Sequence, residues 1–91
     1  MNYEIRFVPS VENTIKKWKK SNPHLHKKLI KVLQDIAVHP RTGIGHPEAL
    51  KGGSDITYSR HITAYDRIIY DIYDERIVVL VVEIEDHYHD K

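Results

Sequence analysis

Residues 77–84, IVVLVVEI, form a run that is apolar at nearly every position and rich in β-branched side chains. A run of this kind predicts a strand that is covered on both faces and lies centrally in a sheet. Since 91 residues provide for only one small core, this strand is expected to organise a single domain spanning residues 1–91.

Three more segments have the pattern of strands. Tyr3, Ile5 and Phe7 alternate with polar residues, which is the period of a half-buried strand. Residues 56–62 and 67–73 are strand candidates, and short polar segments join them to each other and to the run at 77–84. Four strands are therefore expected.

Two amphipathic helices are predicted between the first and second strands. Ser10 is a candidate cap of the first helix. Asn22 followed by Pro23 is a start signal for the second helix, which His39 and Pro40 end. The order β-α-α-β-β-β predicts an α+β domain in which two N-terminal helices pack on one face of a small, mostly antiparallel four-stranded sheet. The opposite face should be partly open.

Charge is distributed unevenly along the chain. Residues 1–53 carry ten Lys and Arg against four Asp and Glu, whereas residues 54–91 carry four against nine. Seven of the basic residues lie between Lys16 and Lys31, on predicted helices. Such a face can contact phosphates, or it can be an ordinary solvated lysine surface. No cysteine is present, and no segment resembles a signal peptide or a membrane span, which favours a cytoplasmic protein without a membrane contact.

Two arginines suggest an anion site. With a turn near residues 63 and 64, Arg60 is expected roughly opposite Arg67 on the neighbouring strand. Like charges placed across a ladder destabilise it, so an anion between them is one interpretation. Neutralisation by nearby aspartates is the other. Residues 40–55, rich in Gly and Pro, predict a surface loop of the kind that often carries function.

The chain reaches His87, Tyr88 and His89 directly after its apolar strand. Cleaving RNA without a metal needs a base for the ribose 2′-hydroxyl, a cation for the phosphorane and an acid for the departing 5′-oxygen. Glu48, Arg67 with Arg60, and His87 can fill these roles, and Tyr88 could stack on a base, with help from Tyr65 or Tyr58. A metal site is a rival interpretation, in which His87 and His89 bind zinc together with Glu85 or Asp90.

Three motifs carry a family resemblance: HPRTGIGHPEALKG at residues 39–52, YSRHITAYDRIIYDI at residues 58–72, and the terminal HY. The chain resembles the YoeB toxins of the RelE superfamily, the ribosome-dependent mRNA interferases of type II toxin–antitoxin pairs. The resemblance implies a RelE-like fold, with Glu48 as general base and Arg67 as the phosphate-stabilising arginine. It also implies His87 as general acid, no cofactor and no metal, with substrate contacts from Arg60, Lys51 and Tyr88.

Departures from the family pattern are also visible. Glu85, Asp86 and Asp66 stand where the family often has basic residues or histidine, and residues 89–91 extend beyond the HY. The site is therefore expected to be less positive than usual.

The resemblance further implies partners. A YefM-like antitoxin of the Phd/YefM type should neutralise the toxin, operator DNA should be bound only by the toxin–antitoxin complex, and a homodimer is possible. The ribosome and its mRNA are expected to be contacted through basic residues of the first helix, which are Lys16, Lys17, Lys19 and Lys20. Two alternatives stay open: a catalytically inactive toxin-like module that binds an antitoxin in promoter repression, and a ribosome-independent endoribonuclease.

Overall fold

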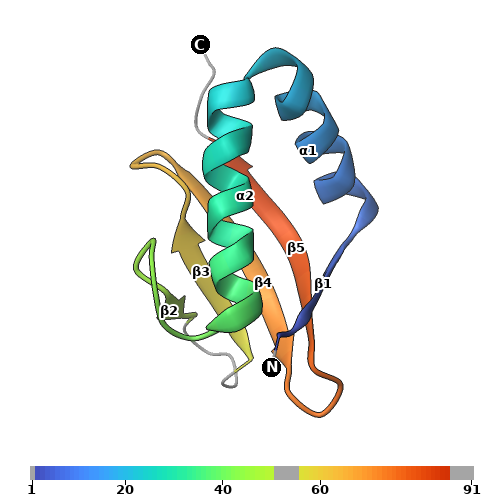
Figure 1. The fold of residues 1–91 in the computed structure, drawn as a ribbon, viewed down its shortest axis with the longest axis vertical. Coiled ribbons are helices and arrows are strands. Elements are labelled where there is room, and N and C mark those ends of the chain that lie inside the picture. Colours follow the sequence, from blue (N-terminus) through green and yellow to red (C-terminus); the bar gives the residue numbers. More distant parts are fainter. Residues whose placement is uncertain (1, 51–55, 87–91) are drawn as a thin grey trace.

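The computed structural model describes residues 2–50 and 56–86. Two helices pack against one face of a twisted sheet (Figure 1). They are α1 (Pro9–Ser21) and α2 (Pro23–Val38). The strands are β1 (Glu4–Phe7), β2 (Glu48–Ala49), β3 (Thr57–His61), β4 (Asp66–Tyr73) and β5 (Val78–Asp86). The predicted α+β class and element order are confirmed, but the described sheet has five strands because the short β2 was not foreseen.

The strands lie in the order β1-β5-β4-β3-β2. β1 runs parallel to β5, and the remaining neighbours are antiparallel. The apolar run thus occupies an interior strand, as its composition predicted. The prediction that both of its faces are covered is wrong. Val79 and Val81 on its helix-facing side are fully buried, whereas Glu83 is exposed, so only one face is completely covered.

A bulge in β5 explains why buried valines and the exposed Glu83 lie on opposite faces of the sheet. Ile69 pairs with Glu83 and the next residue, Tyr70, pairs with Val81, which leaves Val82 as an extra residue in β5. A one-residue insertion reverses the alternation of side chains between the two faces. Glu83 therefore lies on the open face, although it is an even number of residues from the buried valines.

The two helices begin differently: α2 has a side-chain cap and α1 has none. The side chain of Asn22 accepts a hydrogen bond from the Leu25 amide at 3.3 Å, as a cap should. The prediction that Ser10 caps α1 is wrong, because the helix already begins at Pro9, with Val8 in the capping position and no side-chain cap. Proline fits the first helical position because the missing N–H would have no partner there.

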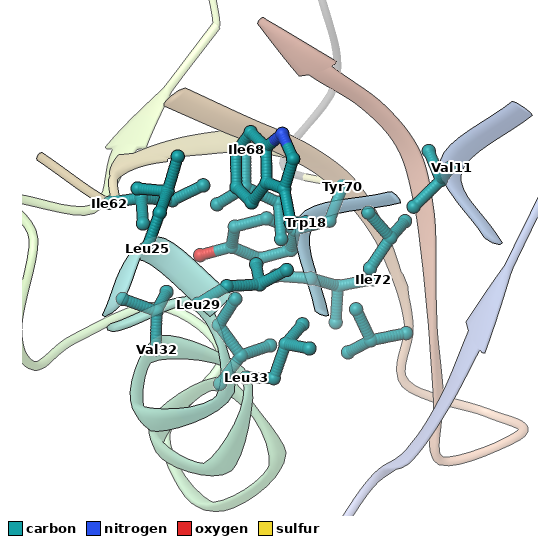
Figure 2. Packing of buried hydrophobic residues seen from close by; sticks show 13 residues of the cluster. Val11, Trp18, Leu25, Leu29, Val32, Leu33, Ile62, Ile68, Tyr70 and Ile72 are labelled. Atoms are coloured by element: carbon teal, nitrogen blue, oxygen red, sulfur yellow. The ribbon is translucent and has the colours of Figure 1, made fainter. Parts of the chain in front are cut away.

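The core lies between the helices and the sheet, where side chains from α1, α2 and β4 converge (Figure 2). Its members are apolar apart from the Tyr70 hydroxyl and the indole N–H of Trp18, and burying each large one stabilises the fold by about 1.5–3 kcal/mol. They include Val11, Trp18, Leu25, Leu29, Val32, Leu33, Ile36, Ile68, Tyr70, Ile72, Val79 and Val81. Within the described residues, the helices and the core thereby cover one face of the sheet and leave the other face without a helix on it. In the part of the chain that the structure describes, neither helix has the length and apolarity needed to span a membrane.

Candidate functional site

Glu48 and Arg67 share the open face of the sheet. Glu48 is paired with Ser59, which is paired in turn with Ile69, and Arg67 lies two residues before Ile69 on β4. Directly paired residues point to the same face, as do residues two apart on one strand. From strand spacing and rise, the Cα atoms of Glu48 and Arg67 are about 12 Å apart. The structure therefore brings the expected base and the expected cation to one surface, where Glu48 is exposed.

The guanidinium of Arg67 is held by a carboxylate of the neighbouring strand. Its Nε donates to Oε1 of Glu85 at 2.9 Å, and its Nη2 lies 2.8 Å from the same oxygen. The two residues are directly paired between β4 and β5. An incoming phosphate would therefore have to compete with Glu85 for the arginine.

A shallow hollow of about 410 Å³ surrounds this ion pair. It is lined by His61, Ala64, Tyr65, Arg67 and Glu85, and Tyr65 is 74% exposed at its rim. His61 was not singled out by the sequence analysis, but it pairs directly with Arg67 and shares its face. A predicted strand register shifted by one residue would have placed His61, in place of Arg60, opposite Arg67.

The expectation that Arg60 faces Arg67 across an anion is wrong. Arg60 is paired with Ile68, so its side chain lies on the helix-covered face, where it is fully buried. Its guanidinium is engaged by Asp35, Tyr70 and backbone carbonyls. Arg60 therefore has no surface from which to contact a substrate.

Several expected site residues lie outside the described residues. These are Lys51, His87 and Tyr88, and also His89 and Asp90 of the alternative zinc site. Within residues 2–50 and 56–86, no cluster of three or more metal-ligating side chains is found. β5 ends at Asp86, so His87 directly follows a strand that crosses the open face.

Two carboxyls meet at this end of the sheet. Asp66 and Asp86 are directly paired, and Asp66 is 6% exposed. One oxygen of Asp66 accepts a hydrogen bond from Thr63 at 2.6 Å, while the other is buried without a partner among the described residues. Asp86 is exposed, but partial desolvation of its carboxyl raises the pKa, and the charge of Asp66 raises it further, whereas Lys17 opposes the shift. Asp86 therefore retains its proton to a higher pH than an isolated aspartate does.

The basic residues of α1 do not line the hollow. They are exposed and belong to a helix whose apolar side, with Val11 and Trp18, packs on the sheet. The four expected contacts are Lys16, Lys17, Lys19 and Lys20. An exposed basic helix is what electrostatic binding to a polyanion requires.

Comparison with known proteins decides the family. The model of the YoeB-like toxins of bacterial type II toxin–antitoxin systems matches residues 7–88. The chain belongs to this family. The toxin YoeB of Streptomyces coelicolor is 34% identical over 71 residues, which cover 78% of this chain and 82% of that protein.

Two solved structures from Staphylococcus aureus agree with this assignment to the YoeB family. A YoeB–YefM complex is similar with a TM-score of 0.80 at 28% identity, and a YoeB dimer with a TM-score of 0.81 at 27% identity. Each similarity covers 97% of this chain and 100% of the other. The resemblance noted in the sequence is thus confirmed over nearly the whole chain, and so is the RelE-like fold.

Proposed function

We propose that this YoeB-family toxin is a ribosome-dependent mRNA interferase that cleaves RNA by metal-independent acid–base catalysis. The observation that carries the proposal is the placement of Glu48 and Arg67 on one open sheet face, where Arg67 lines the hollow and Glu48 lies on the edge strand β2. His87 follows β5 directly in the sequence. These three side chains supply the three functions that the reaction needs.

In this reaction Glu48 accepts the proton of a ribose 2′-hydroxyl, and the resulting 2′-oxygen attacks the adjacent phosphorus. Arg67 stabilises the negative charge that develops on the phosphorane. The bond from phosphorus to the 5′-oxygen then breaks, and His87 gives that oxygen a proton. The products are a 2′,3′-cyclic phosphate and a 5′-hydroxyl end.

The substrate is unpaired mRNA held along the open face. Lys51 and Tyr88 are proposed to contact it through charge and stacking. His61 and Tyr65 line the hollow beside Arg67, and Tyr65 exposes an aromatic face suited to a base. Arg60 is not proposed as a substrate contact, because its side chain is fully buried.

The proposed partners follow from the family and from charge. A YefM-type antitoxin would bind and neutralise the toxin, as supported by the similarity to YoeB in the YoeB–YefM complex. Operator DNA would be bound by that complex, and a homodimer is supported by the similarity to a YoeB dimer. The lysines of α1 would contact ribosomal RNA through charge, and a cytoplasmic location is proposed with this contact.

A second candidate function is an inactive module that binds its antitoxin and represses a promoter. The ion pair of Arg67 with Glu85 favours it, because the expected phosphate-binding cation is already neutralised. The two functions differ in whether RNA is cut, so a cleavage experiment separates them.

The test uses mRNA on translating ribosomes with the purified protein. We expect cleavage products that end in a 2′,3′-cyclic phosphate and a 5′-hydroxyl. A matched mRNA with one 2′-deoxy nucleotide before the scissile phosphate should remain intact at that position. Cleavage of the 2′-deoxy mRNA would exclude attack by the 2′-hydroxyl, and absence of cleavage in both would favour the binding module.

A further inference from the structure

Arg60 is a fully buried arginine whose hydrogen-bonding capacity is filled. A guanidinium has five N–H donors, and five acceptors are placed around this one. Nε donates to the Tyr70 hydroxyl at 2.9 Å, and Nη1 donates to Asp35 at 2.5 Å. The other three acceptors are backbone carbonyls of His39, Thr42 and Ile44.

These carbonyls belong to the segment that leaves the C-terminal end of α2. His39 is the cap residue of that helix, so the cation of Arg60 also lies at the negative end of the helix dipole. Asp35, in the last turn, accepts from the Ile44 amide at 3.1 Å as well as from Arg60. Helix end, arginine and loop thereby form one network.

Tyr70, a partner of Arg60, and His61, its neighbour on β3, hold the loop at further points. The Tyr70 hydroxyl donates to the Pro40 carbonyl at 2.8 Å. The His61 amide, next along β3, donates to the Gly45 carbonyl at 2.7 Å. Gly45 has φ +81°, and a Cβ there would come within 2.5 Å of the His61 carbonyl. The loop is thus tied to the sheet from Pro40 to Gly45.

The tied loop leads directly to Glu48. Only two residues separate Gly45 from β2, and β2 is a strand of two residues at the edge of the sheet. So short a strand has few hydrogen bonds of its own to fix its place. The position of Glu48 therefore depends on the loop before it.

We propose that Arg60 is a positioning residue, which fixes residues 40–45 and thereby holds Glu48 over the open face. This proposal rests on the proposed function, in which Glu48 is the general base. Arg60 touches no substrate and acts through the loop. Its action should therefore disappear when Glu48 can no longer accept a proton.

The test compares Arg60→Lys with Tyr70→Phe, the milder change, which removes one hydroxyl from the network. Ile72→Val serves as the matched control, since Ile72 is buried on the same strand as Tyr70 and has no hydrogen bond from its side chain. Single-turnover cleavage on ribosomes is measured for each variant alone and in a Glu48→Gln background. Hydrogen exchange is measured at the amides of Ile44 and His61.

We expect Arg60→Lys to slow cleavage by about tenfold to a hundredfold at saturating ribosomes, since displacing a reacting group by about 1 Å can cost this much. In the Glu48→Gln background it should have no further effect. Tyr70→Phe should act in the same direction and more weakly, and Ile72→Val should leave the rate unchanged. Exchange at the Ile44 and His61 amides should accelerate in the two network variants only.

An equal slowing by Arg60→Lys in the presence and absence of the Glu48 carboxylate would overturn the proposal. So would exchange at the two loop amides that is no faster in Arg60→Lys and Tyr70→Phe than in Ile72→Val. If Glu48→Gln alone cleaves like the wild type, the assignment of the base fails, while accelerated exchange still supports the fixing of the loop by Arg60. The two failures are therefore distinguishable.

Discussion

Arg67 on β4 and Glu85 on β5 are directly paired across the open face, and Nη2 of Arg67 lies 2.8 Å from Oε1 of Glu85. The side chains are 36% and 28% exposed, so the pair is partly screened by water. Such pairs contribute only about 0–1 kcal/mol to stability. The main effect of this contact is that it neutralises the positive charge that Arg67 would present to a phosphate.

Removing the carboxylate of Glu85 should therefore strengthen RNA binding. We expect Glu85→Gln to bind a short single-stranded RNA severalfold more tightly at low salt, with a smaller gain at high salt because of screening. Fluorescence anisotropy at several salt concentrations measures this. The control is Glu83→Gln, on the same strand and face but opposite Ile69. Equal gains in both variants would show a general charge effect and no competition for Arg67.

Loss of a proton-transferring group should impair cleavage far more than folding. Glu48→Gln and His87→Gln should each slow mRNA cleavage by about a hundredfold to ten-thousandfold, while antitoxin binding and melting temperature stay near wild type. Arg67→Ala should also slow cleavage, through lost electrostatic stabilisation. Glu12→Gln on α1 is the control for a removed surface carboxylate. Full toxicity of Glu48→Gln in growing cells would assign the base to another residue.

The basic face of α1 should control association with the ribosome. Replacing its four lysines with Gln should weaken ribosome binding and flatten its dependence on salt, because fewer counterions are released. The replaced residues are Lys16, Lys17, Lys19 and Lys20. A matched control replaces Lys27, Lys28 and Lys31, which are exposed on α2. Unchanged salt dependence in the α1 variant would place the ribosome contact elsewhere.

Cleavage should require the ribosome, because the hollow holds little net positive charge with which to grip free RNA. The pair of Arg67 with Glu85 is neutral overall, and the basic residues are concentrated on the helices. We expect mRNA to be cleaved much faster with translating ribosomes than as free RNA at physiological salt. The rates in parallel tubes provide the comparison. Equally fast cleavage of free mRNA would support the ribosome-independent endoribonuclease.

The pair of Asp66 with Asp86 should make stability depend on pH. Partial desolvation and the charge of Asp66 raise the pKa of Asp86, so the folded state binds a proton at this carboxyl more tightly than the unfolded chain, in which aspartate titrates near pH 4. The stability that this bound proton contributes is fully present below about pH 4, and it is lost as the pH rises through the higher pKa of Asp86 in the folded state.

In Asp86→Asn this loss should disappear. At pH 7 the variant should be more stable than the wild type by less than about 1 kcal/mol, because Asp86 is exposed and its charge is screened. Urea unfolding from pH 4 to pH 8 measures the difference, with Glu75→Gln in the β4–β5 turn as control. A wild type whose stability rises over this range in parallel with Asp86→Asn would contradict the assignment.

The sequence by itself determined the elements and the core. The apolar run of β5, the helical stripes and the signals at Asn22 and Pro23 are local patterns, and each predicted its element. Periodicity records the buried side of a helix, a continuous apolar run indicates an interior strand, and a cap residue marks a helix start. The motifs around Glu48 and Arg67 likewise indicated the family without any tertiary information. What these patterns have in common is that neighbours along the chain are sufficient to define them.

Only the tertiary structure decided which side chains meet. Arg60 and His61 are adjacent, and a shift of one residue in strand register exchanges the face on which each lies. β4 is buried at Ile68, Ile69 and Tyr70 in succession, so its sequence gives no alternation that fixes the register. The network of Asp35, Arg60 and the loop joins segments that are distant in sequence. The bulge in β5, which turns Glu85 toward Arg67, likewise depends on pairing between strands, which no local pattern records.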